Sequence, residues 1–194
     1  MKKNKLHQKI GITRKNRYPD LFDYCSKLKT GNIRIMSFGC SIGLECKTLK
    51  NYFPDSEIVG IDINEKFIKI ANRIKNDDKT SYDTTIEGHG TFDFIFALSV
   101  LCKYPQTKTK ENCSEIYPFS KFEEKVVELS NKLNKDGYLV IYNSNFKMTD
   151  TSIADSFEPL SVKDDSGFFP KFSKDNKNSN ENYPYSVFKK IKYM

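Results

Sequence analysis

The chain has 194 residues, a net charge of +7 and a hydrophobic fraction of 38%. That length suits one domain with a single buried core, and the 15 Phe and 11 Tyr argue against a disordered chain. No apolar run approaches the roughly 18 residues of a membrane span, and no signal-peptide core follows the basic N-terminus, so we expect a cytoplasmic protein.

The first half of the chain alternates helical and strand patterns. Residues 1–17 form a basic leader without hydrophobic periodicity, and we treat residues 18–194 as one domain. Helices are predicted at about 18–28, 44–52 and 64–74, and strands at 33–38, 58–62 and, weakly, 84–87. Strand, helix, strand, helix is typical of a parallel sheet with crossover helices.

The second half continues this α/β pattern. Residues 92–101 are the most apolar run and predict a central strand buried on both faces. A loop, a helix, a polar turn and a strand are then predicted at 103–118, 120–133, 134–137 and 138–142. The tail carries apolar patches at 153–160, 167–172 and 185–191. The whole pattern predicts a mostly parallel sheet flanked by helices.

The segment Gly39-Cys40-Ser41-Ile42-Gly43 joins the first strand to a helix. Such a turn places backbone N–H groups at the carboxyl edge of the sheet, where open α/β sheets bind ligands. Asp62 ends the next strand, 19 residues after Gly43, where its carboxylate could accept hydrogen bonds from a ribose diol. Ser41 and Leu44 occupy two glycine positions of the dinucleotide fingerprint, and the Gly-Lys-Ser/Thr of a phosphate loop is absent.

Residues 35–45 resemble motif I of class I S-adenosylmethionine-dependent methyltransferases, particularly the Gly-Cys-Ser-x-Gly-x-Glu variant of the chemotaxis-receptor methyltransferase group. Residues 58–64 are similar to the next element of that family, 92–101 to its fourth strand, and 133–141 to its Leu-x-Pro-Gly-Gly turn and fifth strand. The resemblance covers residues 18–145 in family order. It implies a single Rossmann-like domain and S-adenosylmethionine as the cofactor.

The resemblance also implies roles for individual residues. Family members often carry an acidic residue two positions before the first motif glycine, where this chain has Ser37. Adenine recognition is poorly marked, with Asp83, Ile86 and Glu87 as candidates. The implied cofactor contacts are the loop residues Gly39, Cys40, Ser41 and Gly43, then Asp62 on the ribose hydroxyls with Ile63 beside it, and Leu98 and Ser99 after the fourth strand.

Few catalytic side chains are obligatory, because the sulfonium already activates the methyl group and the protein has mainly to align the acceptor. Tyr104 is a candidate for positioning an acceptor, with a packing role as the alternative. His89 lies between two glycines and is a candidate general base, with a solvated turn residue as the alternative. His7 is expected to be inert.

The expected partner is an unidentified methyl acceptor, and a small molecule or protein is favoured over nucleic acid. The lysines are spread along the whole chain, so the net charge does not mark one nucleic-acid surface. The alternatives are an RNA or DNA methyltransferase, or a degenerate protein that binds the cofactor without turnover. The five cysteines form no CxxC pair and lack nearby histidines, so neither a disulfide framework nor a metal site is predicted.

Overall fold

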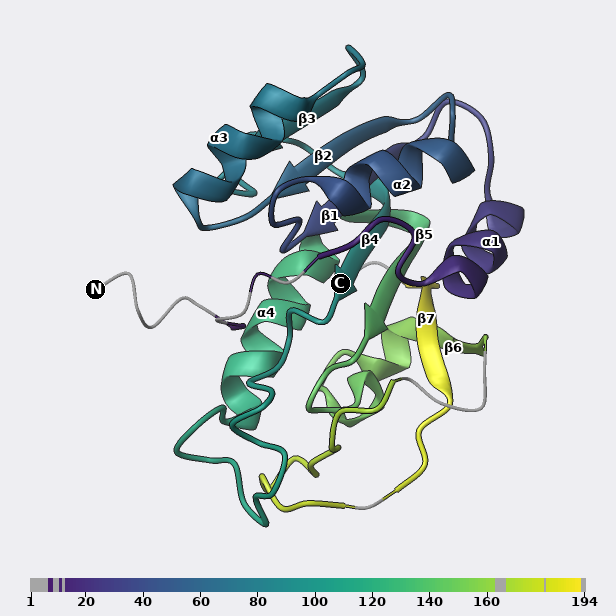
Figure 1. The fold of residues 1–194 in the computed structure, drawn as a ribbon. Coiled ribbons are helices and arrows are strands. Elements are labelled where there is room, and N and C mark those ends of the chain that lie inside the picture. Colours follow the sequence, from purple (N-terminus) through teal and green to yellow (C-terminus); the bar gives the residue numbers. More distant parts are fainter. Residues whose placement is uncertain (1–6, 9–10, 12, 163–166, 180, 193–194) are drawn as a thin grey trace. The chain divides into compact units, whose positions relative to one another are not determined.

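Apart from the weak strand expected at 84–87, the predicted strands and helices form in the structure, a computed structural model that describes residues 7–8, 11, 13–162, 167–179 and 181–192 (Figure 1). The helices are α1 (Pro19–Leu28), α2 (Leu44–Tyr52), α3 (Glu65–Ile74) and α4 (Phe119–Asn131), with short 3-10 turns η2 (Met148–Asp150) and η3 (Ala154–Ser156). The strands are β1 (Arg34–Phe38), β2 (Glu57–Ile61), β3 (Thr80–Asp83), β4 (Phe92–Leu98), β5 (Leu133–Tyr142), β6 (Phe157–Ser161) and β7 (Tyr185–Lys190).

The seven strands belong to one sheet with the order β3-β2-β1-β4-β5-β7-β6. Strand β1 pairs in parallel with β2 and β4, and β2 pairs in parallel with β3. Strand β7 runs antiparallel between β5 and β6. This mostly parallel sheet with helices between its strands confirms the predicted Rossmann-like α/β fold.

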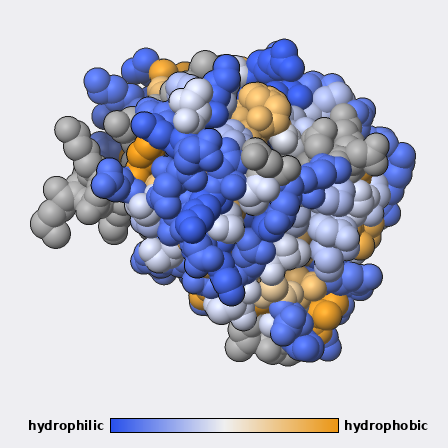
Figure 2. All heavy atoms as spheres, turned by 90° about the horizontal axis from the view of Figure 1, so that it is seen from below, coloured by the Kyte–Doolittle hydropathy of each residue, from blue (hydrophilic) through white to orange (hydrophobic). Residues whose placement is uncertain are grey.

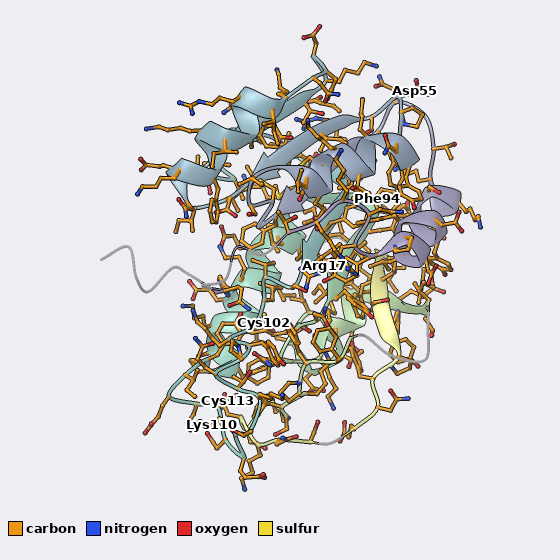
Figure 3. The ribbon with its side chains drawn as sticks, in the orientation of Figure 1. Arg17, Asp55, Phe94, Cys102, Lys110 and Cys113 are labelled. Atoms are coloured by element: carbon orange, nitrogen blue, oxygen red, sulfur yellow. The ribbon has the colours of Figure 1, made fainter. Side chains whose placement is uncertain are left out.

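The chain packs as two compact units, and strand β4 contributes residues to both. The first unit comprises residues 10–96, and the second comprises residues 1–9 and 97–194. In the first unit β1 and β4 carry the core, and Phe94, marked in Figure 3, is fully buried. Its ring lies 5.4 Å from the Phe53 ring and 5.7 Å from the Phe96 ring. Strand β4 is therefore the buried central strand that its apolar sequence predicts.

Aromatic packing also builds the core of the second unit. The buried Phe146 ring lies within about 6 Å of four other rings, which belong to Tyr117, Phe119, Phe122 and Phe172. The buried Lys190 Nζ donates to the carbonyl oxygens of Ser130 (2.8 Å) and Leu133 (3.0 Å). A lysine from β7 thus bonds one carbonyl in the last turn of α4, where a helix leaves carbonyls without partners, and one at the start of β5.

Three predicted boundaries are wrong, each for a backbone reason. The weak strand expected at 84–87 is a turn, and β3 lies just before it, with Thr80 and Tyr82 buried on one face. Strand β4 stops at Leu98 instead of residue 101, because Ser99 adopts a positive φ of 56°. Strand β5 already begins at Leu133, so the predicted turn at 134–137 lies inside it, with Asp136 at a φ of 59°.

The described surface agrees with the Lys-rich and Asn-rich composition. The face in Figure 2 is mostly hydrophilic, with small separated hydrophobic patches. Phe168 is the large apolar residue with the highest exposure, at 71%. Within the described residues, no helix has both the length and the apolar character that crossing a bilayer requires.

Candidate functional site

The glycine loop after β1 turns through three residues with positive φ. Gly39, Ser41 and Gly43 have φ values of 82°, 51° and 84°, and glycine is the residue that adopts this region at little cost. The N–H groups of Gly39 and Cys40 both donate to the Ile61 carbonyl oxygen, at 2.7 and 3.0 Å. The loop is therefore fastened to the end of the neighbouring strand β2.

Asp62 fixes the same loop from the end of β2. Its Oδ2 accepts a hydrogen bond from Ser41 N, and its Oδ1 accepts one from Asn64 N, both at 2.9 Å. Burial raises the pKa of this carboxyl, and the two backbone donors act in the opposite direction. Ile63, the next residue, is 38% exposed. The strand pairing thus brings the predicted residues Gly39, Ser41, Gly43, Asp62 and Ile63 to one edge of the first unit.

Glu45, in the first turn of α2, reaches back to β1. Its Oε1 accepts a hydrogen bond from Ser37 Oγ at 2.8 Å. A carboxylate from α2 therefore lies beside Ser37, two residues before the first glycine of the loop. Burial raises the pKa of Glu45 to about 7, against the opposing effects of Ser37 and the nearby Arg17, which Figure 3 marks.

Gly43 has a packing reason to be glycine in addition to its backbone angle. A Cβ built on Gly43 would lie 2.6 Å from Tyr82 Oη, so the tyrosine of β3 already occupies the space beside it. The Tyr82 hydroxyl donates a long hydrogen bond to the Gly43 carbonyl oxygen (3.4 Å). Cys40 is also enclosed, with a buried thiol, so its backbone is the part that the loop presents.

Two candidates from the sequence meet at the end of β3. His89 Nε2 lies 3.0 Å from Asp83 Oδ2, and Thr84 N donates to Asp83 Oδ1 at 2.5 Å. The hydrogen bonds from Thr84 and His89 lower the pKa of Asp83. Arg34 Nη1 also donates to the His89 carbonyl oxygen (2.8 Å). His89 is therefore anchored on its turn by a carboxylate and a guanidinium.

The described part of the leader contacts the glycine loop. The Gly11 carbonyl oxygen accepts a hydrogen bond from Ser41 Oγ at 3.0 Å, and the Phe67 ring of α3 packs against Gly11. Farther along, Asn16 N donates to Thr48 Oγ1 of α2 at 2.9 Å. The leader is thus bound to the loop and to the helix that follows it, although its sequence has no periodicity.

In the second unit, a buried asparagine organises the end of β4. Leu98 is buried, and Ser99 Oγ accepts a hydrogen bond from Asn143 Nδ2 at 3.0 Å. Asn143 Oδ1 in turn accepts one from Phe168 N, also at 3.0 Å. A Cβ on Gly167 would lie 2.0 Å from that Oδ1. The predicted residue Ser99 is therefore held by a residue, Asn143, that sequence reasoning missed.

Tyr104 is a stacked, half-buried side chain. Its ring lies parallel to the Phe169 ring at 4.3 Å and perpendicular to the Phe168 ring at 6.0 Å. The Tyr104 carbonyl oxygen accepts a hydrogen bond from Gln8 Nε2 at 3.0 Å. This aromatic packing gives Tyr104 a structural role, and Phe168 leaves an exposed ring beside it.

Comparison with known proteins gives one family match. Residues 36–116 match a family model described as a methyltransferase domain. No curated protein matches the chain.

Solved structures with similar folds come from several methyltransferases. One is the plantazolicin methyltransferase BpumL in complex with SAH, with 18% identity and a TM-score of 0.47 over 64% of this chain and 46% of that chain. Another is SAM-bound CalS10, an amino pentose methyltransferase from Micromonospora echinaspora, with 18% identity and a TM-score of 0.46 over 63% of this chain and 48% of that chain. A third, PKMT2 from Rickettsia typhi, has 19% identity and a TM-score of 0.46 over 64% of this chain and 24% of that chain.

The chain spans less than half the length of each of these three proteins. The family match begins in β1 and includes the glycine loop, Asp62, β3 and β4. Three of the four segments on which the sequence resemblance rests lie within or overlap this match, and the fourth, 133–141, lies outside it. The strand order is that of an open α/β sheet whose central strands are parallel. The part of the chain that matches the methyltransferase-domain model, residues 36–116, therefore lies within the part that resembles class I S-adenosylmethionine-dependent methyltransferases.

Proposed function

We propose that this protein binds S-adenosylmethionine on the glycine loop and transfers its methyl group to an acceptor. The observation that carries the proposal is the Asp62 carboxylate, which is fixed by two backbone N–H groups beside a loop with three positive φ angles. An ionised carboxylate has about four lone-pair sites, so two remain for the ribose hydroxyls. The exposed Ile63 next to it offers an apolar contact for the adenine ring.

Glu45 supplies the acid for the methionine end of the cofactor. Its carboxylate is enclosed and bonded to Ser37 Oγ, so an ammonium group placed there would gain a charge-assisted hydrogen bond. Asp83, at the end of β3, is the corresponding acceptor for the adenine amino group, and His89 orients its carboxylate. The leader, through its contact between Gly11 and Ser41, serves as a lid over the loop.

Methyl transfer itself asks for alignment of the acceptor with the methyl carbon and for exclusion of water. The resemblance to class I methyltransferases suggests the segment after β4 as the acceptor contact, and in this chain Asn143 holds Ser99 there and Tyr104 stacks on Phe169. A small molecule or protein acceptor fits better than nucleic acid, because the basic residues are dispersed along the chain.

The decisive experiment is incubation of the protein with methyl-labelled S-adenosylmethionine and fractionated cell extract. We expect label to enter a small-molecule or protein fraction, and the Asp62→Ala variant to abolish that transfer. Label in RNA would identify a nucleic-acid methyltransferase instead. Tight cofactor binding without label in any fraction would contradict the proposed transfer and indicate a binding protein that has lost turnover.

A further inference from the structure

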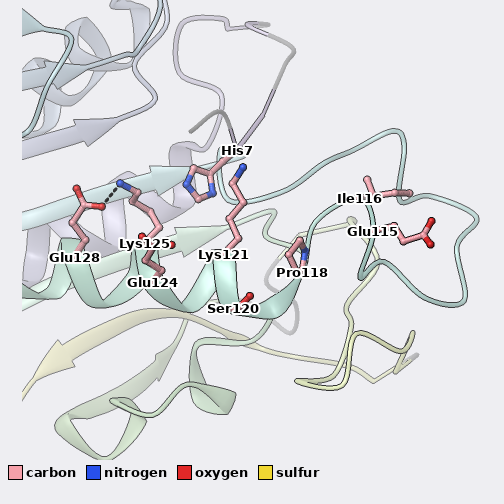
Figure 4. Close-up of a pocket in the computed structure, with 9 residues that line it drawn as sticks. All are labelled: His7, Glu115, Ile116, Pro118, Ser120, Lys121, Glu124, Lys125 and Glu128. Carbon is pink, nitrogen blue, oxygen red and sulfur yellow. Dashed lines mark hydrogen bonds and ion pairs between the residues drawn. The ribbon is translucent and has the colours of Figure 1, made fainter. Parts of the chain in front are cut away.

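A pocket of about 630 Å³ lies along helix α4 in the second unit (Figure 4). This volume falls within the roughly 300–1,000 Å³ of small-molecule sites. The pocket is distinct from the glycine loop, which belongs to the first unit. Its lining combines His7 of the leader with residues of the loop before α4 and of the helix itself, namely Glu115, Ile116, Pro118, Ser120, Lys121, Glu124, Lys125 and Glu128.

The leader reaches this pocket through specific contacts. His7 is 6% exposed, and its Nδ1 lies 2.6 Å from the hydroxyl oxygen of the fully buried Tyr117. The two rings meet edge to face at 5.6 Å. Gln8, the next residue, donates from Nε2 to Cys102 Sγ (3.2 Å) and to the Tyr104 carbonyl oxygen. His7 is therefore a built component of the pocket, which its position in a basic leader did not predict.

The hydrogen bond to Tyr117 fixes which nitrogen of His7 carries the proton. Among the described residues the Tyr117 hydroxyl has His7 Nδ1 as its hydrogen-bond partner, so the O–H group donates to Nδ1 and avoids a buried donor without an acceptor. Burial, followed by the charges of Lys121, Lys125 and Lys103, lowers the pKa of His7 to about 3. The neutral ring then carries its hydrogen on Nε2, which has no partner among the described residues.

Charges of both signs line the pocket, with three glutamates and two lysines, but the charged groups that act on the imidazole are lysines. Figure 4 shows the His7 ring beside the Lys121 and Lys125 side chains, which rise from α4. Glu128 forms an ion pair with Lys125. Burial lowers the pKa of Lys121, and the charge of Glu124 opposes this shift. The groups that act on His7 itself are lysines. A ligand at this end of the pocket thus meets an N–H donor, two ammonium groups and the first turn of a 13-residue helix.

We propose that this pocket binds the carboxylate or phosphate group of a small acidic molecule, with His7 Nε2–H and Lys121 as its donors and Lys125 as a flanking charge. Ser120, in the first turn of α4, adds a hydroxyl, while Ile116 and Pro118 contact the apolar part of the ligand. None of the lining residues belongs to the unit that contains the glycine loop, so anion binding can be tested without the methyl cofactor.

The test uses nuclear magnetic resonance of the histidine rings in the full-length protein without cofactor. The chain has two histidines, so a His89→Gln variant assigns the His7 signals. Inorganic phosphate and succinate are titrated separately, with chloride at matched ionic strength as the control. We expect saturable shifts of the His7 ring signals with at least one of the two anions and none with chloride. The anion that binds with the higher affinity, phosphate or succinate, identifies whether the pocket prefers a phosphate or a carboxylate group.

Two substitutions and one control complete the test. Lys121→Gln should weaken anion binding about tenfold, since it removes a charged donor, whereas Lys135→Gln removes the same charge from an exposed residue outside the pocket and should leave it unchanged. Tyr117→Phe should move the ring proton away from Nε2, visible in the ¹⁵N shifts, and weaken binding. Linear shifts that never saturate with phosphate or succinate, or equal affinity in the Lys121 variant, would overturn the proposal.

Discussion

At the residue scale, Asp62 links the glycine loop to the start of α3 while keeping lone pairs available. Replacing Asp62 by alanine should weaken S-adenosylmethionine binding by about 1.5–3 kcal/mol, the range for hydrogen bonds to a charged group. Isothermal titration calorimetry measures the change. Asp55→Ala, which removes the same charge from an exposed turn before β2, is the matched control (Figure 3). Equal S-adenosylmethionine affinity in the two variants would show that Asp62 is not part of the cofactor site.

Glu45 gives the proposed site a pH dependence of defined sign. Its pKa is raised to about 7, so the carboxylate is ionised above that pH and neutral below it. Because the cofactor ammonium needs the ionised form, affinity should fall about tenfold from pH 8 to pH 6. Calorimetry across this range should show the loss in the native protein and a flat profile in Glu45→Gln.

The stability of the fold should depend on pH in the opposite direction to the cofactor affinity. The folded protein binds the Glu45 proton more tightly than the unfolded chain does, so this group stabilises the fold below its unfolded pKa, and the contribution is lost as pH rises through about 7. Denaturant unfolding of Glu45→Gln should lack that decline. If neither the cofactor affinity nor the stability of the native protein changed between pH 6 and pH 8, the position assigned to the Glu45 carboxyl would be wrong.

At the scale of the element, the glycine loop has to satisfy a backbone angle and a packing limit together. Gly43→Val should abolish cofactor binding, because φ is 84° and Tyr82 fills the space that a side chain would need. Gly39→Val should do the same through its φ of 82°. Gly31→Ala is the control, since Gly31 has a φ of 88° with open space around it. The Gly31→Ala variant should lose about 1 kcal/mol of stability and bind the cofactor normally. Normal cofactor binding in the two valine variants would show that the loop only connects β1 to α2.

The leader is the second element with a separable prediction. If residues 1–17 form a lid, their deletion should raise the cofactor dissociation rate, because Ser41 Oγ loses its bond to Gly11. Neutralising Lys2, Lys3 and Lys5 in the full chain should leave that rate unchanged. Stopped-flow displacement measures it.

A nucleic-acid arm would behave differently. In that case the deletion and the neutralised variant would both lower RNA affinity and flatten its salt dependence by about one unit per lost phosphate contact. Unchanged cofactor dissociation with a large loss of RNA affinity would show that the leader is not a lid.

Helices and strands with a clear period were predictable from the sequence, and contacts between distant segments were not. Helix α2 follows from its apolar spacing and Pro54, and α3 from the Asn64 cap, whose Oδ1 does accept from Lys66 N. The hydrogen bond between Glu45 and Ser37 depends on the angle at which α2 leaves the glycine loop. No local sequence pattern predicts that angle. The burial of His7 depends on Tyr117, 110 residues away.

At the scale of the whole molecule, the parallel half of the sheet was the predictable part, because βαβ connections have one favoured hand and a clear hydrophobic pattern. The antiparallel part was not assigned, since the apolar patches at 153–160 and 185–191 are short and separated by a polar stretch. They become β6 and β7, which pair with each other across that stretch. The apolar patch at 167–172 forms no long strand and instead packs Phe169 and Phe172 into the second unit.

The position of β7 between β5 and β6 sets an order for assembly during synthesis. The ribosome makes β5 and β6 before β7, so neither strand can pair with β7 until residues 185–190 have been synthesised. The same strand brings Lys190, whose ammonium group bonds one carbonyl in the last turn of α4 and one at the start of β5. The pairing of β5 with β6 through β7 and this lysine contact therefore both require that translation has passed residue 190.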